Sequence, residues 1–177
     1  LTTYAAGERL LQKDLARTLR RIAQYGAAGF YEGPVAQAIV AELTTDTEHL
    51  SLKDLQEYRV VVREPVQGSY RGFEVYSMPA PSSGGVHLLQ ILNLLERYPL
   101  AEYGSGSAQT LHLMAESARL AYADRAEHLG DPDFVKVPQA GLIAKKYADR
   151  LAPKINANRA TPSAVVKAGA PQDFESD

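Results

Sequence analysis

The stretch 77–90 constrains the fold most, because a strand-like pattern ends there and a helix-like pattern begins. Pro79 and Pro81 fix φ and end any preceding strand, and Ser82 and Ser83 are good helix N-caps. The sequence therefore predicts a joint between a sheet and a helix. That helix is apolar around much of its circumference and is expected to be buried, with these apolar residues: Leu88, Leu89, Ile91, Leu92, Leu94 and Leu95.

Four small residues at this joint form the candidate binding site: Ser82, Ser83, Gly84 and Gly85. Their hydroxyls and free backbone amides can hold an anion or a carboxylate, as helix N-termini do. We favour a capped helix whose glycines permit close packing, because helix caps greatly outnumber anion sites. A serine nucleophile with His87 as its base is a third interpretation, but the stretch is not a G-x-S-x-G elbow.

Residues of about 59–78 alternate with the period of two that is typical of strands. We expect a β-hairpin in which the valine run 60–62 opens the first strand and residues 67–70 form the turn. Phe73 and Val75 then lie in the second strand. Pro65 cannot donate to a sheet ladder, which predicts an edge or a bulge at that position.

The first part of the chain predicts helices. Leucines recur at helical spacing over 11–25, and a second apolar face follows over 35–43. Ser51-Leu52-Lys53-Asp54 resembles a capping box that opens a short helix. Phe30 and Tyr31 are expected to close the pair of helices rather than to bind a ligand. His49 lies in a polar loop, and we assign it no role.

Two buried helices are expected over 84–98 and 107–129. His112 and Glu116 lie one turn apart, but H-E-x-x-H is absent, so we interpret them as an exposed pair and expect no metal site. The second helix also has a face of small and apolar residues that predicts close packing: Leu111, Met114, Ala115, Ala118, Ala121 and Tyr122. Turn and cap bonds are favoured over a cation site for four later residues: Glu127, His128, Asp131 and Asp133.

Composition argues against several classes of protein. The chain has 177 residues, 45% of them hydrophobic, and a net charge of −2, as expected for a globular chain. Lys and Arg do not outnumber Asp and Glu, which argues against a nucleic-acid partner. No apolar run is long enough to cross a bilayer, and the absence of cysteine excludes disulfides and thiolate chemistry. The first residue is Leu1 rather than Met, so we expect the true start, with any signal peptide, to lie upstream.

Several strings occur in a fixed order along the chain: Asp-Leu-Ala at 14–16, Gly-Phe-Tyr-Glu-Gly at 29–33, Tyr-Arg-Gly-Phe at 70–73, Pro-Ser-Ser-Gly-Gly at 81–85, Gln-Ile-Leu-Asn-Leu-Leu-Glu at 90–96, Ala-Tyr-Ala-Asp-Arg at 121–125 and Gly-Asp-Pro-Asp-Phe at 130–134. In this order and at similar separations, these strings resemble the large subunit of the γ-glutamyltranspeptidase family. Two departures are Ala80, where that family often has a third proline, and residues 45–48, where it commonly has a glycine pair.

The resemblance implies an α/β fold, in which this helix-rich chain is part of an N-terminal nucleophile (Ntn) hydrolase αββα sandwich completed by a small subunit. It also implies a precursor that cleaves itself. The new N-terminal threonine of the small subunit, expected just after Asp177, would attack the γ-glutamyl amide of glutathione and related amides. Water, an amino acid or a peptide then accepts the γ-glutamyl group. Neither a metal nor an organic cofactor is implied.

The same resemblance divides the chain into part of a large-subunit domain, 1–152, and an extended tail, 153–177, that leads to the autocleavage point. The polar composition of this tail, with its prolines and glycine, agrees with that division. The arginine that holds the substrate carboxylate is implied to lie upstream of Leu1, and the nucleophile beyond the tail. We therefore assign no catalytic residue in this chain and predict that the chain alone is inactive.

Two other functions stay open. Acylases that act on cephalosporin side chains share the superfamily, and a non-catalytic scaffold relative would keep the same motifs. A periplasmic or secreted location is implied by the family alone.

Overall fold

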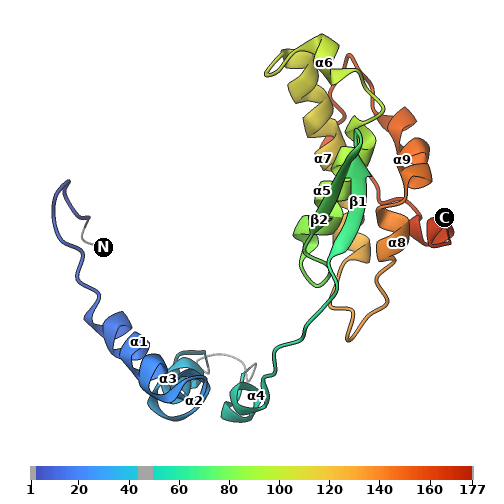
Figure 1. The fold of residues 1–177 in the computed structure, drawn as a ribbon. Coiled ribbons are helices and arrows are strands. Elements are labelled where there is room, and N and C mark those ends of the chain that lie inside the picture. Colours follow the sequence, from blue (N-terminus) through green and yellow to red (C-terminus); the bar gives the residue numbers. More distant parts are fainter. Residues whose placement is uncertain (1–2, 44–49, 177) are drawn as a thin grey trace. The chain divides into compact units, whose positions relative to one another are not determined.

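The computed structural model describes residues 3–43 and 50–176, so His49 and residues 45–48 lie outside the described residues. The chain forms two compact units with a boundary between Val62 and Arg63. This boundary falls inside the stretch 1–152 that we expect to be part of a large-subunit domain, and the tail 153–177 belongs to the second unit. The first unit contains these helices (Figure 1): α1 Lys13–Tyr25, α2 Ala28–Tyr31, α3 Gly33–Leu43 and α4 Leu52–Glu57.

The second unit combines a β-hairpin with helices and single turns of 3-10 helix, so the described part of the chain is α/β and rich in helix (Figure 1). None of its described helices, nor those of the first unit, is long and apolar enough to cross a membrane. The elements are β1 Val66–Tyr70, β2 Phe73–Ser77, α5 Ser83–Leu95, α6 Leu100–Tyr103, α7 Ala108–His128, α8 Gln139–Leu142, α9 Lys145–Leu151, η1 Ala152–Lys154, η2 Ser163–Val165 and η3 Pro171–Phe174.

Local contacts shape the first unit. The Ser51 side chain accepts a hydrogen bond from the Asp54 backbone, and the Asp54 carboxylate accepts one from the Ser51 backbone at 2.8 Å, which confirms the capping box. Tyr31 stacks on Tyr58 with ring centroids 5.2 Å apart, and Phe30 meets the Tyr31 ring edge-on. The stack of Tyr31 on Tyr58, the C-cap residue of α4, thus joins the end of α4 to α2.

The β-hairpin turns later in the sequence than expected. The two strands pair antiparallel from Val66 opposite Ser77 to Tyr70 opposite Phe73, so the loop is the two residues Arg71 and Gly72. Both have positive φ, 49° and 87°, as the favoured two-residue hairpin turn requires.

The expected turn at 67–70 is therefore wrong, and its glycine has another role. Gly68 lies within β1, where an added Cβ would come within 2.7 Å of the Leu89 side chain of α5. A strand glycine often marks such a close approach. The valine run 60–62 is exposed and precedes the hairpin, since β1 begins only after Pro65.

Helix α5 is the centre of the second unit, with the hairpin on one side and α7 and α9 on others (Figure 1). It runs Ser83–Leu95, close to the expected 84–98, and its buried residues lie around most of its circumference, as predicted. The apolar core of the unit collects residues from α5, α7, α8 and α9: Val86, Leu94, Leu120, Leu142, Tyr147, Ala148 and Leu151.

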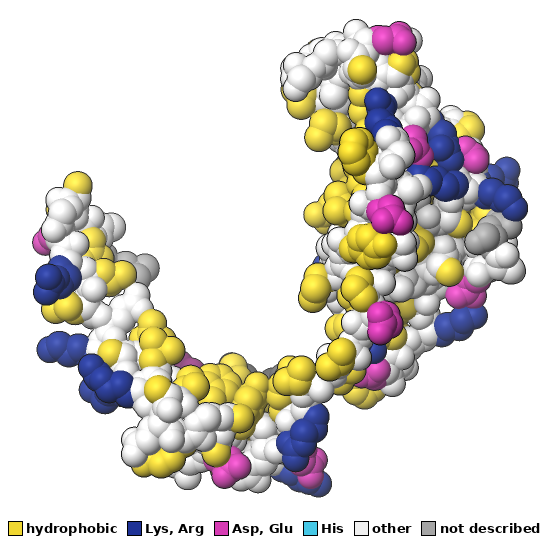
Figure 2. Space-filling model, in the orientation of Figure 1, with side chains coloured by type: hydrophobic (Ala, Val, Ile, Leu, Met, Phe, Trp, Pro, Cys, Tyr) yellow, Lys and Arg dark blue, Asp and Glu magenta, His cyan; other side chains and the backbone are white. Residues whose placement is uncertain are grey.

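Helix α7 runs Ala108–His128, close to the expected 107–129, but the face predicted to pack is largely open. Leu111, Met114 and Tyr122 are 55%, 47% and 61% exposed. Figure 2 shows hydrophobic side chains gathered on the side of this unit where α7, α5 and the hairpin lie. The residues of α7 that are buried include polar ones, Glu116 and Asp124, which the tail covers.

The tail is not simply extended. It contains η2 and η3, Pro171 is buried, and Phe174 packs against Tyr147 with ring centroids 5.3 Å apart. Gly141 of α8 approaches the tail so closely that an added Cβ would lie 1.9 Å from the Pro171 carbonyl oxygen. The tail is thus part of the packed unit.

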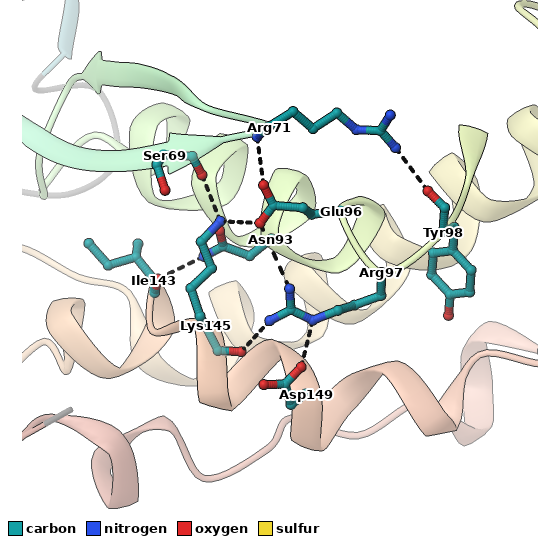
Figure 3. A network of polar contacts seen from close by, with 9 residues as sticks. All are labelled: Ser69, Arg71, Asn93, Glu96, Arg97, Tyr98, Ile143, Lys145 and Asp149. Carbon is teal, nitrogen blue, oxygen red and sulfur yellow. Dashed lines mark hydrogen bonds and ion pairs between the residues drawn. The ribbon is translucent and has the colours of Figure 1, made fainter. Parts of the chain in front are cut away.

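A polar network fastens the hairpin to α5 and α9 (Figure 3). The Glu96 carboxylate accepts a hydrogen bond from the Arg71 backbone at 2.6 Å and pairs with the Lys145 ammonium. Lys145 also donates to the Ser69 carbonyl oxygen at 2.7 Å. Arg97 pairs with Asp149 at 2.6 Å. The hairpin end is therefore held by charge-assisted bonds.

This network makes the stability of the folded protein depend on pH. Burial alone raises the pKa of Glu96, but the bonds from Lys145 and Arg71 outweigh it and lower the pKa below the ordinary 4.5. A lowered folded-state pKa contributes stability that is present above the unfolded value and lost as pH falls through the folded value. We expect Glu96→Gln to reduce the loss of stability of the full-length protein below about pH 4.5. The urea unfolding midpoints of the Glu96→Gln variant and of the unmodified protein, measured across pH, test this prediction. An equal loss of stability at low pH in the two proteins would contradict it.

Candidate functional site

The predicted candidate residues lie where the hairpin meets the N-terminus of α5. Ser82 is the N-cap with an extended backbone, and its hydroxyl accepts a hydrogen bond from the Gly84 amide at 3.4 Å. Ser82 and Ser83 are half-buried and Gly84 is exposed. The capped helix is therefore observed, and its first turn remains open to contact.

The two glycines of the joint differ in surroundings. A Cβ added to Gly85 would lie 2.2 Å from the Met78 carbonyl oxygen and 2.7 Å from the Val66 side chain. A Cβ added to Gly84 would meet only the Ser82 hydroxyl, at 3.6 Å. Gly85 thus permits the close packing that we favoured, whereas nothing in the described packing requires Gly84 to lack a side chain.

A serine nucleophile is not assembled at this joint. The His87 imidazole donates from Nδ1 to the backbone carbonyl oxygen of Ser83 rather than contacting its hydroxyl. The other ring nitrogen, Nε2, is buried and has no hydrogen-bond partner among the described residues. The His87 ring lies 5.4 Å from that of Tyr122. His87 is thus a buried histidine of the α5–α7 packing.

The strand side of the joint is fixed by a contact from α8. The backbone N–H of Ala80, which is 3% exposed, donates to the Gln139 side-chain oxygen at 3.1 Å. Because Ala80 stands between Pro79 and Pro81, its amide is the donor that this short segment offers. The joint is therefore held on both sides, by Gln139 and by the packing of Gly85.

Glu116 is not part of an exposed pair, contrary to our interpretation. It is 3% exposed, accepts a hydrogen bond from the Thr161 backbone at 3.1 Å and pairs with Arg119. Burial raises the pKa of Glu116, but the bonds from Thr161 and the charges of Arg119 and His112 outweigh it and lower the pKa. His112 instead contacts the Asn156 carbonyl oxygen at 2.7 Å.

A buried cluster around Asp124 was missed from the sequence. The Asp124 carboxylate, 1% exposed, accepts hydrogen bonds from the Tyr147 hydroxyl at 2.8 Å, the Gln90 amide and the Gly169 backbone at 2.7 Å. Burial and the bond to Asp124 raise the pKa of Tyr147, so its hydroxyl stays protonated as a donor. The one sequence signal was an aspartate in the middle of a helix among small residues.

The acidic residues after α7 form bonds within the protein. Asp133 pairs with Arg63 at 2.7 Å, and its backbone N–H donates to the Asp131 carboxylate at 3.0 Å. His128 contacts the Gly169 carbonyl oxygen at 3.0 Å. Within residues 3–43 and 50–176, no group of three or more His, Cys, Asp or Glu is placed to hold a metal ion. The turn bond that we favoured is thus observed for the Asp131 carboxylate, whereas the Asp133 carboxylate pairs with Arg63 and His128 contacts a distant residue.

Comparison with known proteins covers nearly the whole chain. The family model described as gamma-glutamyltranspeptidase matches residues 2–176. The glutathione hydrolase proenzyme of Escherichia coli is 46% identical over 171 residues, which cover 97% of this chain and 30% of that protein. An acylase ACY 1 proenzyme of a Pseudomonas strain is 46% identical over 143 residues, which cover 81% of this chain and 26% of that acylase proenzyme.

A solved structure shows the same fold. The γ-glutamyltranspeptidase of Helicobacter pylori has a TM-score of 0.81 and 45% identity over 94% of this chain and 48% of that chain. The chain thus spans about 30% of its curated Escherichia coli relative.

Proposed function

Because the chain belongs to the γ-glutamyltranspeptidase family, we propose that it is the C-terminal part of the large subunit of a self-processing γ-glutamyltranspeptidase. The match of the family model to residues 2–176 carries this proposal. The finer fold that we propose is an αββα sandwich of the Ntn-hydrolase type, of which this chain forms a helix-rich part. A small subunit from the same precursor completes it.

The proposed chemistry takes place outside this chain. The precursor breaks just after Asp177 or within a few residues of it, and the threonine at the start of the small subunit becomes the nucleophile. Its hydroxyl attacks the γ-glutamyl carbonyl of glutathione or a related amide, and its freed α-amine takes the proton. Water or the amine of an amino acid or peptide then accepts the γ-glutamyl group.

The role proposed for this chain is to support that site. Ser82, Ser83 and Gly84 present hydroxyls and an open helix N-terminus, while Gly85 holds the helix against the hairpin. We assign these residues binding or supporting roles, and no catalytic one. A periplasmic or secreted location is part of the proposal, and cell fractionation of the native host tests it.

We expect the full-length gene product to consist of two chains after purification. Intact mass and N-terminal sequencing should show a second chain that begins with threonine just beyond the tail. Replacing that threonine with alanine is the matched control and should leave a single inactive chain. The processed protein should hydrolyse a γ-glutamyl anilide, while residues 1–177 alone should not. A single uncleaved chain from the unmodified gene would favour a non-catalytic scaffold.

A second candidate function rests on one observation. The ACY 1 acylase proenzyme is as similar in identity, 46%, as the Escherichia coli glutathione hydrolase proenzyme. Acylase activity on cephalosporin side chains is therefore the alternative. The rates at which the processed full-length protein hydrolyses glutathione and a glutaryl cephalosporin distinguish the two, since the preferred substrate should be turned over with the higher kcat/KM.

A further inference from the structure

In the second unit, the tail is bound along α7. Side chains of α7 contact backbone groups of the tail. His112, near the start of the helix, contacts the Asn156 carbonyl oxygen at 2.7 Å. Further along the helix, Glu116 and Arg119 hold Thr161. The contacts thus follow the same order along the helix and along the tail.

Two tail residues are held through both backbone groups. The Thr161 N–H donates to Glu116 at 3.1 Å, and its carbonyl oxygen accepts from Arg119. At the next contact, Asp124 and His128 hold the N–H and the carbonyl oxygen of one residue, Gly169, at 2.7 and 3.0 Å. Because both backbone groups are bound, neither tail residue can slide or rotate without breaking a bond.

The spacing of the two contacts also fixes the path of the tail. Between Glu116 and Asp124 a helix rises roughly 12 Å, whereas the tail from Thr161 to Gly169 would span roughly 26 Å if fully extended. The 3-10 turn η2, Ser163–Val165, shortens that segment. Because the segment between Thr161 and Gly169 is shortened in this way, the tail can form both contacts with α7.

Past Gly169 the tail is fastened up to its last described residues. Pro171 is buried against Gly141, Phe174 packs on Tyr147, and Lys136 pairs with Glu175 at 2.8 Å. The expected cleavage point lies only a short distance beyond Glu175. A constraint on the position of Gly169 therefore also restrains the segment that leads to the expected cleavage point.

We propose that α7 clamps the tail at Thr161 and Gly169 and thereby positions the peptide bond beyond it for self-cleavage, with Asp124 and Glu116 as positioning residues. The inference rests on the proposed function. In that cleavage the threonine hydroxyl oxygen bonds to the preceding carbonyl carbon, the C–N bond breaks, and the hydroxyl proton passes to the amine. Water then hydrolyses the resulting ester to a carboxyl group and the free hydroxyl.

The test uses the full-length protein and two measurements. Asp124→Asn removes the charge that holds Gly169 and should slow conversion of the precursor into two chains about 10- to 100-fold, because small misplacements of reacting atoms are costly. Trypsin cleavage after Lys167, which lies between the two contacts, should become about tenfold faster under native conditions. Trypsin measures the clamp itself, whether or not self-cleavage occurs.

Thr110→Val is the matched control. Thr110 is a buried polar residue of the same helix, but its hydroxyl donates to the Gly104 carbonyl oxygen at 2.8 Å and not to the tail. We expect both rates to stay within roughly twofold of the unmodified protein. Arg119→Met is the second variant, suited to the case in which Asp124→Asn does not fold, because the Arg119 side chain is 27% exposed. It should change both rates in the same direction, by about threefold or more.

Each outcome decides between the interpretations. Unchanged trypsin cleavage in a folded Asp124→Asn or Arg119→Met protein would show that α7 does not clamp the tail. Faster trypsin cleavage with an unchanged processing rate would show a clamp that does not position the bond. If the unmodified precursor never cleaves, the proposed function fails and the positioning role fails with it, while the trypsin comparison still decides whether the clamp exists.

Discussion

Gly85→Ala should lower the free energy of unfolding of the full-length protein by about 3 kcal/mol, because overpacking a tight contact has costs of this order. The new Cβ would lie 2.2 Å from the Met78 carbonyl oxygen, 2.9 Å from the Met78 nitrogen and 2.7 Å from the Val66 side chain. Two of these atoms are backbone, so no rotamer change relieves the clash and α5 must move away from the hairpin. Urea unfolding measures the loss.

Gly84→Ala is the matched control, one residue away in the same helix. Its Cβ would meet only the Ser82 hydroxyl, at 3.6 Å. We expect this variant to be neutral or up to about 1 kcal/mol more stable, since alanine is the better helix former. Equal destabilisation by the two variants would contradict the packing role of Gly85. Loss of activity in a fully stable Gly84→Ala protein would support the binding role proposed for the joint.

Gly141→Ala should also destabilise the protein by about 3 kcal/mol and release the end of the tail. Its Cβ would lie 1.9 Å from the Pro171 carbonyl oxygen and 2.7 Å from the Pro171 carbonyl carbon. Both are backbone atoms, so α8 and η3 must separate. Urea unfolding measures the loss of stability, and hydrogen exchange over 170–176 should become faster.

Gly130→Ala is the control for this second clash. Its Cβ would lie 2.7 Å from the Val135 side chain, which is 51% exposed and free to rotate away. The cost should stay within about 1 kcal/mol, and exchange in the tail should be unchanged. Equal tail release by the two variants would show that close approach to the Pro171 backbone is not what fastens the tail.

Sequence patterns within a few residues predicted the secondary-structure elements whose ends are set by local hydrogen bonds. The polar and apolar pattern with the serine caps predicted α5, and the Ser51 and Asp54 pair predicted the start of α4. The family resemblance is confirmed by the match over 2–176. The binding or supporting role of Ser82 and Ser83 stays a prediction, because helix caps and anion sites share the same residues.

The predictions that were wrong concern residues whose surroundings depend on contacts with residues far away in the sequence. Gly68 was interpreted as a turn glycine, although it lies within β1 opposite Val75 and packs closely against Leu89 of α5. Glu116 was interpreted as exposed because the residue that covers it, Thr161, is 45 positions away. The α7 face with Leu111, Met114 and Tyr122 was expected to pack but is exposed. The buried residues of α7 include the charged Glu116 and Asp124 as well as Leu113 and Leu120.

The sequence by itself predicted the longer helices close to their observed ends, the caps, the sheet-to-helix joint and the family, because these depend on spacing within a few residues or on matching strings. It did not predict α8 and α9, which complete the core of the second unit. Only the tertiary structure decided which glycines tolerate a Cβ and which charged residues are buried. Asp124 illustrates the reason: its partners Gln90, Tyr147 and Gly169 are 34, 23 and 45 positions away. A carboxylate is stable at 1% exposure only with such donors, and no local pattern specifies them.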